Sequence, residues 1–146
     1  MIQIHVSTPP TLTALADRAQ DAVSRVVYDA GATLLTRIRA NASTGFHRRG
    51  LPHIPGTGPG PNVATGDYRR TWALATGRDA AGNASAVVST NSPQARRLEY
   101  GFTDVDSLGR AFTQPPYPHV RPAVDATRPE LIADLRVAVL RLTRGA

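Results

Sequence analysis

The side chains that could carry chemistry are few and widely spaced in this chain. The four histidines are His5, His47, His53 and His119, and none lies in the Gly-x-Ser-x-Gly or related context of a hydrolase. The sequence contains no cysteine, which excludes disulfides, cysteine nucleophiles and thiolate metal sites. His47 and His53 have no carboxylate near them in sequence, so they do not form a convincing metal site. We therefore expect neither an enzyme nor a bound cofactor or metal.

A glycine-rich stretch at residues 56–60 has the composition of a phosphate-binding loop. Proline interrupts it, no predicted strand precedes it and no lysine follows it, so we reject that interpretation. Eight of the twelve residues in 50–61 are Gly or Pro, which predicts a long exposed loop over 44–63, flexible in the free protein. Arg48 and Arg49 lie on it. A solvated basic loop is the simpler interpretation, and contact with DNA or a partner is the alternative.

The chain is basic, with a formal charge of +6, and all seventeen of its basic residues are arginine. Arginine suits phosphate and carboxylate contacts, so a polyanionic neighbour is compatible with this charge. The arginines are scattered along the sequence, and a solvated surface accounts for most of them. The sequence has neither an apolar run of membrane-spanning length nor the pattern of a secretory signal, and we expect a soluble cytoplasmic protein or one assembled there.

The element that must position the rest is a long helix over residues 11–40. Apolar residues recur there at steps of three and four and form one buried stripe: Leu12, Leu15, Ala19, Ala22, Val26, Ala30, Leu34 and Ile38. Thirty helical residues span about 45 Å, so one end of the helix should project or pack on another copy. Gly31 within the helix predicts the close approach of another backbone.

Shorter elements surround this helix. The patterns predict a strand at 1–6, a hairpin of 71–76 with 84–90 whose Trp72 and Leu74 face the long helix, and a short helix at 93–100. We expect a polar loop at 103–109, a strand at 111–114, a helical turn at 121–126 and a last helix that begins at a capping box, 127–130. The prediction is an α+β fold: one domain, residues 1–146, with the N-terminal and C-terminal helices packed on a small antiparallel β-sheet and 44–63 as a loop insert.

Three segments occur in the order of a known family. They are Thr65-Gly66-Asp67-Tyr68-Arg69-Arg70-Thr71-Trp72, Gln94-Ala95-Arg96-Arg97-Leu98-Glu99-Tyr100-Gly101-Phe102 and Pro118-His119-Val120-Arg121-Pro122-Ala123-Val124-Asp125. In this order the chain resembles the neck, or head–tail joining, proteins of long-tailed double-stranded DNA phages. Tyr68, Trp72, Phe102 and the length of the insert depart from the family pattern. The resemblance implies interface or structural roles for Thr65, Gly66, Arg69, Leu98, Glu99, Tyr100, Gly101, Arg121 and Pro122.

The resemblance also implies a function. We expect a structural virion protein, assembled in the host cytoplasm, that joins the head connector to the tail as part of a ring of six or twelve copies around the DNA channel. Its partners would be copies of itself, neighbouring head-connector and tail proteins, and packaged DNA through non-specific contacts. Two alternatives stay open: a tail terminator that caps the tail tube, and a non-specific nucleic-acid-binding protein.

Glu99 stands out on physical grounds. An acidic residue at the end of a short helix is disfavoured by the helix dipole unless a basic group is near it. Arg121, just before the C-terminal helix, is the first candidate partner and Arg97 the second. We predict a stabilising pair within or between subunits, and not a catalytic role.

Overall fold

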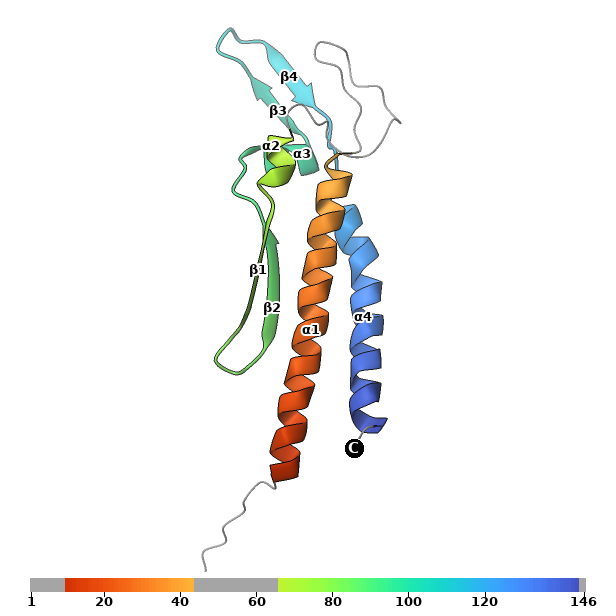
Figure 1. The fold of residues 1–146 in the computed structure, drawn as a ribbon. Helices are drawn as coiled ribbons and strands as arrows, with labels where there is room; N and C mark the ends of the chain where they lie inside the picture. Colours follow the sequence, from red (N-terminus) through yellow and green to blue (C-terminus); the bar gives the residue numbers. More distant parts are fainter. Residues whose placement is uncertain (1–9, 44–65, 145–146) are drawn as a thin grey trace, which may run out of the picture.

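The computed structural model describes residues 10–43 and 66–144, and its α+β architecture confirms the predicted fold class (Figure 1). The elements in chain order are α1 (Pro10–Asn41), α2 (Asp67–Arg70), β1 (Ala73–Arg78), β2 (Ala84–Ser89), α3 (Gln94–Tyr100), β3 (Phe102–Val105), β4 (Ala111–Gln114) and α4 (Val120–Arg144). The predicted strand at 1–6, the loop at 44–63 with Arg48 and Arg49, and the motif residue Thr65 lie outside the described residues.

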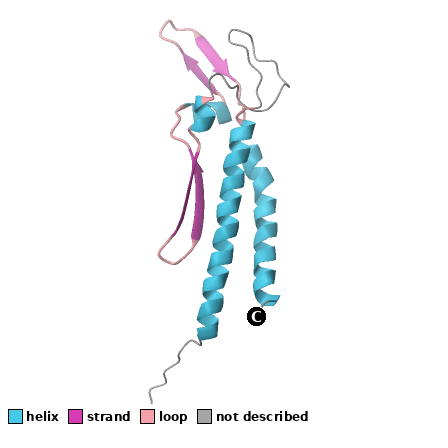
Figure 2. Ribbon diagram, viewed as in Figure 1, coloured by secondary structure: helices cyan, strands magenta, loops and turns pink. Residues whose placement is uncertain are grey.

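Helix α1 is the longest described element, and its extent confirms the predicted long helix. The predicted buried stripe is wrong at its N-terminal end, where Leu12 is 55% exposed because nothing described packs on it; of the eight stripe residues Ile38 is the one that is fully buried. The β1–β2 hairpin packs along one side of it and α4 along another (Figure 2). The prediction placed both long helices on one sheet, whereas α4 packs chiefly on α1 and the strands form two separate two-stranded sheets. Neither described long helix is apolar enough to cross a membrane.

The β1–β2 hairpin lies close against α1 at Gly31. Its strands are antiparallel, with Leu74 opposite Val88 and Thr76 opposite Ala86. A Cβ atom on Gly31 would lie 2.6 Å from the Cβ of Ala86 and 3.0 Å from a methyl carbon of Leu74. The close approach predicted at Gly31 is therefore present, but the groups that approach are side chains of the hairpin and not a backbone.

The second hairpin, β3–β4, corrects the predicted polar loop at 103–109. Residues 102–105 form a strand that pairs with β4, whose own position was predicted correctly. The rings of Phe102 and Phe112 meet edge to face, with centroids 5.4 Å apart. The Asp106 carboxylate accepts the backbone N–H groups of Leu108 and Arg110, which closes the turn. This cross-strand packing and turn chemistry outweigh the polar composition.

Helix α4 is continuous, so the predicted helix start at 127–130 is wrong. Thr127 does not cap a helix, because its hydroxyl donates to the Ala123 carbonyl one turn earlier, and Pro129 lies inside α4. Arg37 of α1 donates to the Thr127 hydroxyl (3.0 Å) and to the Glu130 carboxylate (2.7 Å). These contacts flank the proline on both sides, and they hold the helix on α1 where one backbone hydrogen bond is missing.

The buried core is small and lies where α1 ends and α4 begins. Its fully packed members are Ile38, Trp72 and Ala123. Partly buried side chains surround them: Leu34, Leu35, Tyr68, Val88, Ala95 and Val120. Most of the apolar surface along the lower part of α4 is left outside this core.

Candidate functional site

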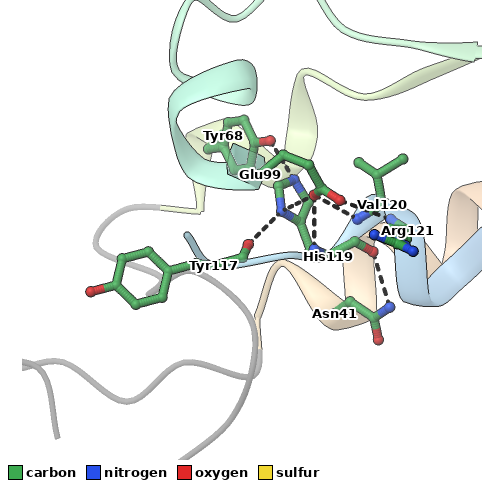
Figure 3. Close-up of polar contacts among 7 residues, drawn as sticks. All are labelled: Asn41, Tyr68, Glu99, Tyr117, His119, Val120 and Arg121. Carbon is green, nitrogen blue, oxygen red and sulfur yellow. Dashed lines mark hydrogen bonds and ion pairs between the residues drawn. The ribbon is translucent and has the colours of Figure 1, made fainter. Parts of the chain in front are cut away.

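Residues of the three sequence motifs meet at one place, where the C-terminal end of α1 reaches the N-terminal end of α4 (Figure 3). Asn41 comes from α1, Tyr68 from α2, Glu99 from α3, and Tyr117 and His119 from the segment that leads into α4. We call these five residues the junction.

Glu99 caps the N-terminus of α4 from a different helix. Its Oε2 accepts the backbone N–H groups of His119 and Val120, each at 2.9 Å, and its Oε1 accepts that of Arg121, also at 2.9 Å. The next residue, Pro122, has no N–H to satisfy. Every donor that the first turn of an α-helix leaves open is thus either paired with one carboxylate or absent. The negative charge also lies at the favourable end of the helix dipole.

The surroundings of Glu99 favour its ionised form. Burial of the side chain, which is 8% exposed, acts to raise its pKa. The three backbone hydrogen bonds and the nearby His119 act in the opposite direction and outweigh burial, so the pKa of Glu99 lies below its ordinary value. A buried carboxylate at neutral pH is stable here because it is fully hydrogen-bonded.

Within the subunit neither predicted guanidinium partner contacts the Glu99 carboxylate, although Arg121 does contact it through its backbone N–H. The Arg121 guanidinium extends along the surface, 4.0 Å from the Asp125 carboxylate. The Arg97 guanidinium lies over the Phe102 ring, 4.6 Å from its centroid. The physical reason is that the start of α4 supplies three oriented N–H groups and a positive dipole end, which satisfy the carboxylate without a side-chain cation.

His119 links Glu99 to Tyr68 and is completely buried. Its Nδ1 lies 3.0 Å from the Tyr117 carbonyl oxygen and 3.1 Å from Glu99 Oε2. Both of those oxygens can only accept, so Nδ1 carries a hydrogen. In the neutral imidazole Nε2 is then the acceptor, and the Tyr68 hydroxyl, 2.5 Å away, donates to it. A continuous hydrogen-bonded chain therefore joins α2, the start of α4 and α3.

The hydrogen-bonded series of hydroxyl, imidazole and carboxylate has the same order of groups as a catalytic triad. The state of each group, however, does not match that of a triad. Burial, the largest influence, raises the pKa of the Tyr68 hydroxyl to about 12, which disfavours the phenolate that a nucleophile requires. The Glu99 carboxylate is occupied by backbone donors, and His119 has no exposed surface. The arrangement can order and stiffen the junction, because a fully satisfied buried network favours one geometry.

Aromatic packing and two further hydrogen bonds tie the helix ends together. The rings of Tyr68, Trp72 and His119 meet pairwise edge to face, with centroids 5.5 to 6.3 Å apart. Arg39 donates to the Trp72 carbonyl (2.7 Å), and Asn41 donates to the His119 carbonyl (3.0 Å). Tyr68 and Trp72, which depart from the resembled motif, are thus two of the three rings in this cluster.

Gly101 and Leu98 place Glu99 at the end of α3. Gly101 has φ +72°, and a Cβ there would lie 2.7 Å from the Gln114 carbonyl oxygen, so only glycine fits both the turn and the space. It ends α3 as predicted and turns the chain into β3. The Leu98 carbonyl accepts the Tyr117 N–H at 2.7 Å, which holds the approach to α4 against α3.

The remaining predicted residues lie outside the junction. Gly66 precedes α2 with φ +77°, in the left-handed region that favours glycine. Arg69 is exposed and donates to the Ser43 hydroxyl at 3.3 Å, while Tyr100 is 76% exposed. The structure therefore brings Leu98, Glu99, Gly101, Arg121 and Pro122 together, and leaves Arg69 and Tyr100 at the surface.

Sequence reasoning missed Asn41, Tyr68, Tyr117 and His119 as members of the site. A signal was present for one of them, because His119 directly precedes a helix start and follows a proline-rich extended path. The position before a helix is where an external carboxylate can reach open N–H groups. The tyrosines and Asn41 carried no comparable local signal.

Comparison with known protein families identifies a match. The model of a family described as "Bacteriophage HK97-gp10, putative tail-component" matches residues 8–101, more than half of the chain. No curated protein and no solved structure matches this chain. The matched region contains α1, the β1–β2 hairpin and α3 with Glu99, and it ends at Gly101.

Proposed function

Because the chain belongs to the HK97-gp10-like family of bacteriophage tail components, we propose that it is a neck subunit that joins the head connector to the tail. Family membership makes it a structural protein of the virion, and it is the observation that carries the proposal. The neck position is our more specific claim. The order of the three motifs supports it, and the third motif supplies the first turn of α4 at the junction.

The subunit acts as one of six or twelve copies in a ring around the DNA channel. Two features of the fold support assembly with further copies. The core formed by the described residues is small, and large apolar side chains on α4 stay exposed in the single subunit, including Ile132, Val139 and Leu140. Such surface is costly to leave in water and is a common mark of an interaction site.

The role is mechanical and not catalytic. The junction fixes α4 on α1, so that the two long helices behave as one rigid unit in the ring. The formal charge of +6 suits a ring around DNA. Arginines that face the channel contact phosphates of the passing DNA without reading its bases.

Loss of the chain from infected cells tests this function directly. If the chain is a joining protein, its loss should leave DNA-filled heads and tails of normal length that do not connect. Supply of the intact chain in trans should then restore whole particles. Tails of abnormal length would instead favour a terminator that caps the tail tube. Normal particles would overturn a virion role and favour a separate nucleic-acid-binding protein.

A further inference from the structure

The lower half of α4 carries an apolar patch beside its contact with α1. A shallow depression there is lined by Ile132, Leu135, Arg136, Val139 and Leu140. Val139 and Leu140 are each 52% exposed. Arg136 lies in the middle of the patch, one helical turn from both Ile132 and Leu140. We call this the α4 patch.

The β1–β2 hairpin has a face of small, uncharged side chains that points away from α1. Leu74 and Ala86 face α1 at Gly31, so the alternate residues of both strands point away from α1. These residues form the cross-strand pairs Ala73 with Ser89, Ala75 with Val87, and Gly77 with Ser85. All six are small or medium-sized and uncharged, and Val87 is 54% exposed. We call this the outer hairpin face.

The two surfaces lie on different sides of α1. The hairpin contacts α1 at Gly31, and α4 contacts it through Arg37. These residues are six apart, and at about 100° per residue they point in widely different directions. Figure 1 shows the hairpin and α4 flanking α1 accordingly.

The two surfaces also lie at the same level along α1. The hairpin runs beside α1 from Gly31, past Tyr28, whose hydroxyl donates to the Gly77 carbonyl, to Asp21, which pairs with Arg78. Helix α4 runs antiparallel to α1 from its contact at Arg37, and both helices rise by about 1.5 Å per residue. The α4 patch therefore stands beside the same part of α1 as the hairpin does.

We propose that the α4 patch of one copy packs on the outer hairpin face of the next copy. This interface rests on the ring of the proposed function and specifies the surfaces that build it. A sheet face of small side chains lets a helix approach closely and buries its apolar residues. Because the two surfaces are different and lie on different sides of the subunit, the contact is head-to-tail, which generates rings when the rotation closes.

The charge of Arg136 favours contact of the α4 patch with the outer hairpin face over a two-fold pairing of α4 with the α4 of another copy. In such a pairing the central Arg136 of one copy would approach the Arg136 of the other in an apolar contact, where like charges are costly. The outer hairpin face is uncharged. Against it, the Arg136 stem can cover apolar surface while its guanidinium extends to the rim.

Cysteine cross-linking in assembled particles tests the interface, and the chain has no native cysteine to interfere. The test variants are Val139→Cys, Val87→Cys and the double variant, with a Thr103→Cys/Val139→Cys chain as the matched control on the other hairpin. Particles are treated with a short bis-maleimide and the products are separated by mass. The double variant should give a ladder of dimers, trimers and larger multimers of this chain, at least tenfold stronger than that of the control chain. Neither single variant should cross-link efficiently.

Each other outcome contradicts the interface in a recognisable way. Strong dimers from Val139→Cys alone would indicate two-fold α4 pairing, and a product with the mass of another virion protein would indicate a different partner for α4. Particles that contain the chain but give no ladder would overturn the interface and leave the neck function intact. Particles that lack the chain altogether would overturn the proposed function itself.

Discussion

The carboxylate of Glu99 lies 2.9 Å from the backbone nitrogen of Arg121, and the Arg121 guanidinium lies elsewhere on the surface. With this contact and two like it, a helix of seven residues, α3, caps a helix of 25 residues, α4. Gly101, two residues after Glu99, ends the short helix because its φ of +72° and the space beside it fit only glycine. The junction therefore fixes the start of α4 at the end of α1, and the Arg37 contacts to Thr127 and Glu130 hold α4 farther along.

Removal of the Glu99 carboxylate should destabilise the protein markedly. In Glu99→Ala, three backbone N–H groups at the start of α4 lose a charged acceptor, and we expect a loss on the order of 3 kcal/mol in the free energy of unfolding. Urea denaturation at neutral pH measures it. Asp104→Ala is the control, because that carboxylate lies on an exposed strand and, among the described residues, accepts the backbone N–H of Val105. Equal effects of the two substitutions would show that the cap does not stabilise the fold.

The contribution of Glu99 should vanish in acid. Its pKa in the folded state is lowered below the ordinary value of 4.5, so its stabilising effect is complete above that value and is lost as the pH falls through the lowered one. The difference in unfolding free energy between the wild type and Glu99→Gln should therefore be largest at neutral pH and shrink below about pH 4. Asp104→Asn is the comparison, because that carboxylate lies on an exposed strand away from α4. A Glu99→Gln difference that is constant across this range would mean that the charge of Glu99 is not what α4 requires.

Gly101 should tolerate substitution less well than Gly109. Both have positive φ, +72° and +76°, so alanine introduces about 1–2 kcal/mol of backbone strain at either position. Only at Gly101 does the new Cβ also meet backbone, at 2.7 Å from the Gln114 carbonyl oxygen, whereas Gly109 has open space. Thermal unfolding of the two variants should show the larger loss for Gly101→Ala. If Gly109→Ala lost as much, strain alone would explain both and the packing argument would fail.

The sequence predicted those parts of the fold that depend on local pattern. The apolar stripe defined α1, alternation indicated the β1–β2 hairpin, and the helix predicted at 93–100 corresponds to α3. The strand β3 was missed because its pairing depends on Phe112, ten residues away from Phe102, which outweighs a polar composition. The continuity of α4 through Pro129 depends on Arg37, which is more than ninety residues distant from it in sequence.

The site was predicted only in part, because its remaining contacts also join residues that are far apart in the sequence. Glu99 was identified because an acid at a helix end conflicts with the helix dipole, and that conflict required a partner somewhere. Local reasoning looked for a cation, whereas the partner is the N-terminus of another helix, which only the tertiary arrangement reveals. His119 and Tyr68 were missed because a buried hydrogen-bonded chain between three segments leaves no periodic signal in any of them.

Contact with DNA should be independent of sequence and sensitive to salt. The charge of +6 is carried by arginines scattered along the chain, which favours contacts with phosphates over readout of bases. Fluorescence anisotropy with two duplexes of unrelated sequence should give equal affinities, and both should fall steeply as the salt concentration rises. A preference of more than about tenfold for one duplex, about 1.4 kcal/mol, would contradict this account.

Cryo-electron microscopy of the intact particle shows whether this chain forms a ring at the neck. We expect density for this chain at the junction of head and tail, as a closed ring of six or twelve copies around the DNA channel. In that density α1 and α4 should keep the mutual position that Glu99 and His119 set, with α4 of each copy against the β1–β2 hairpin of its neighbour. Absence of the chain from the neck, or its presence there as a single copy off the axis, would contradict the account.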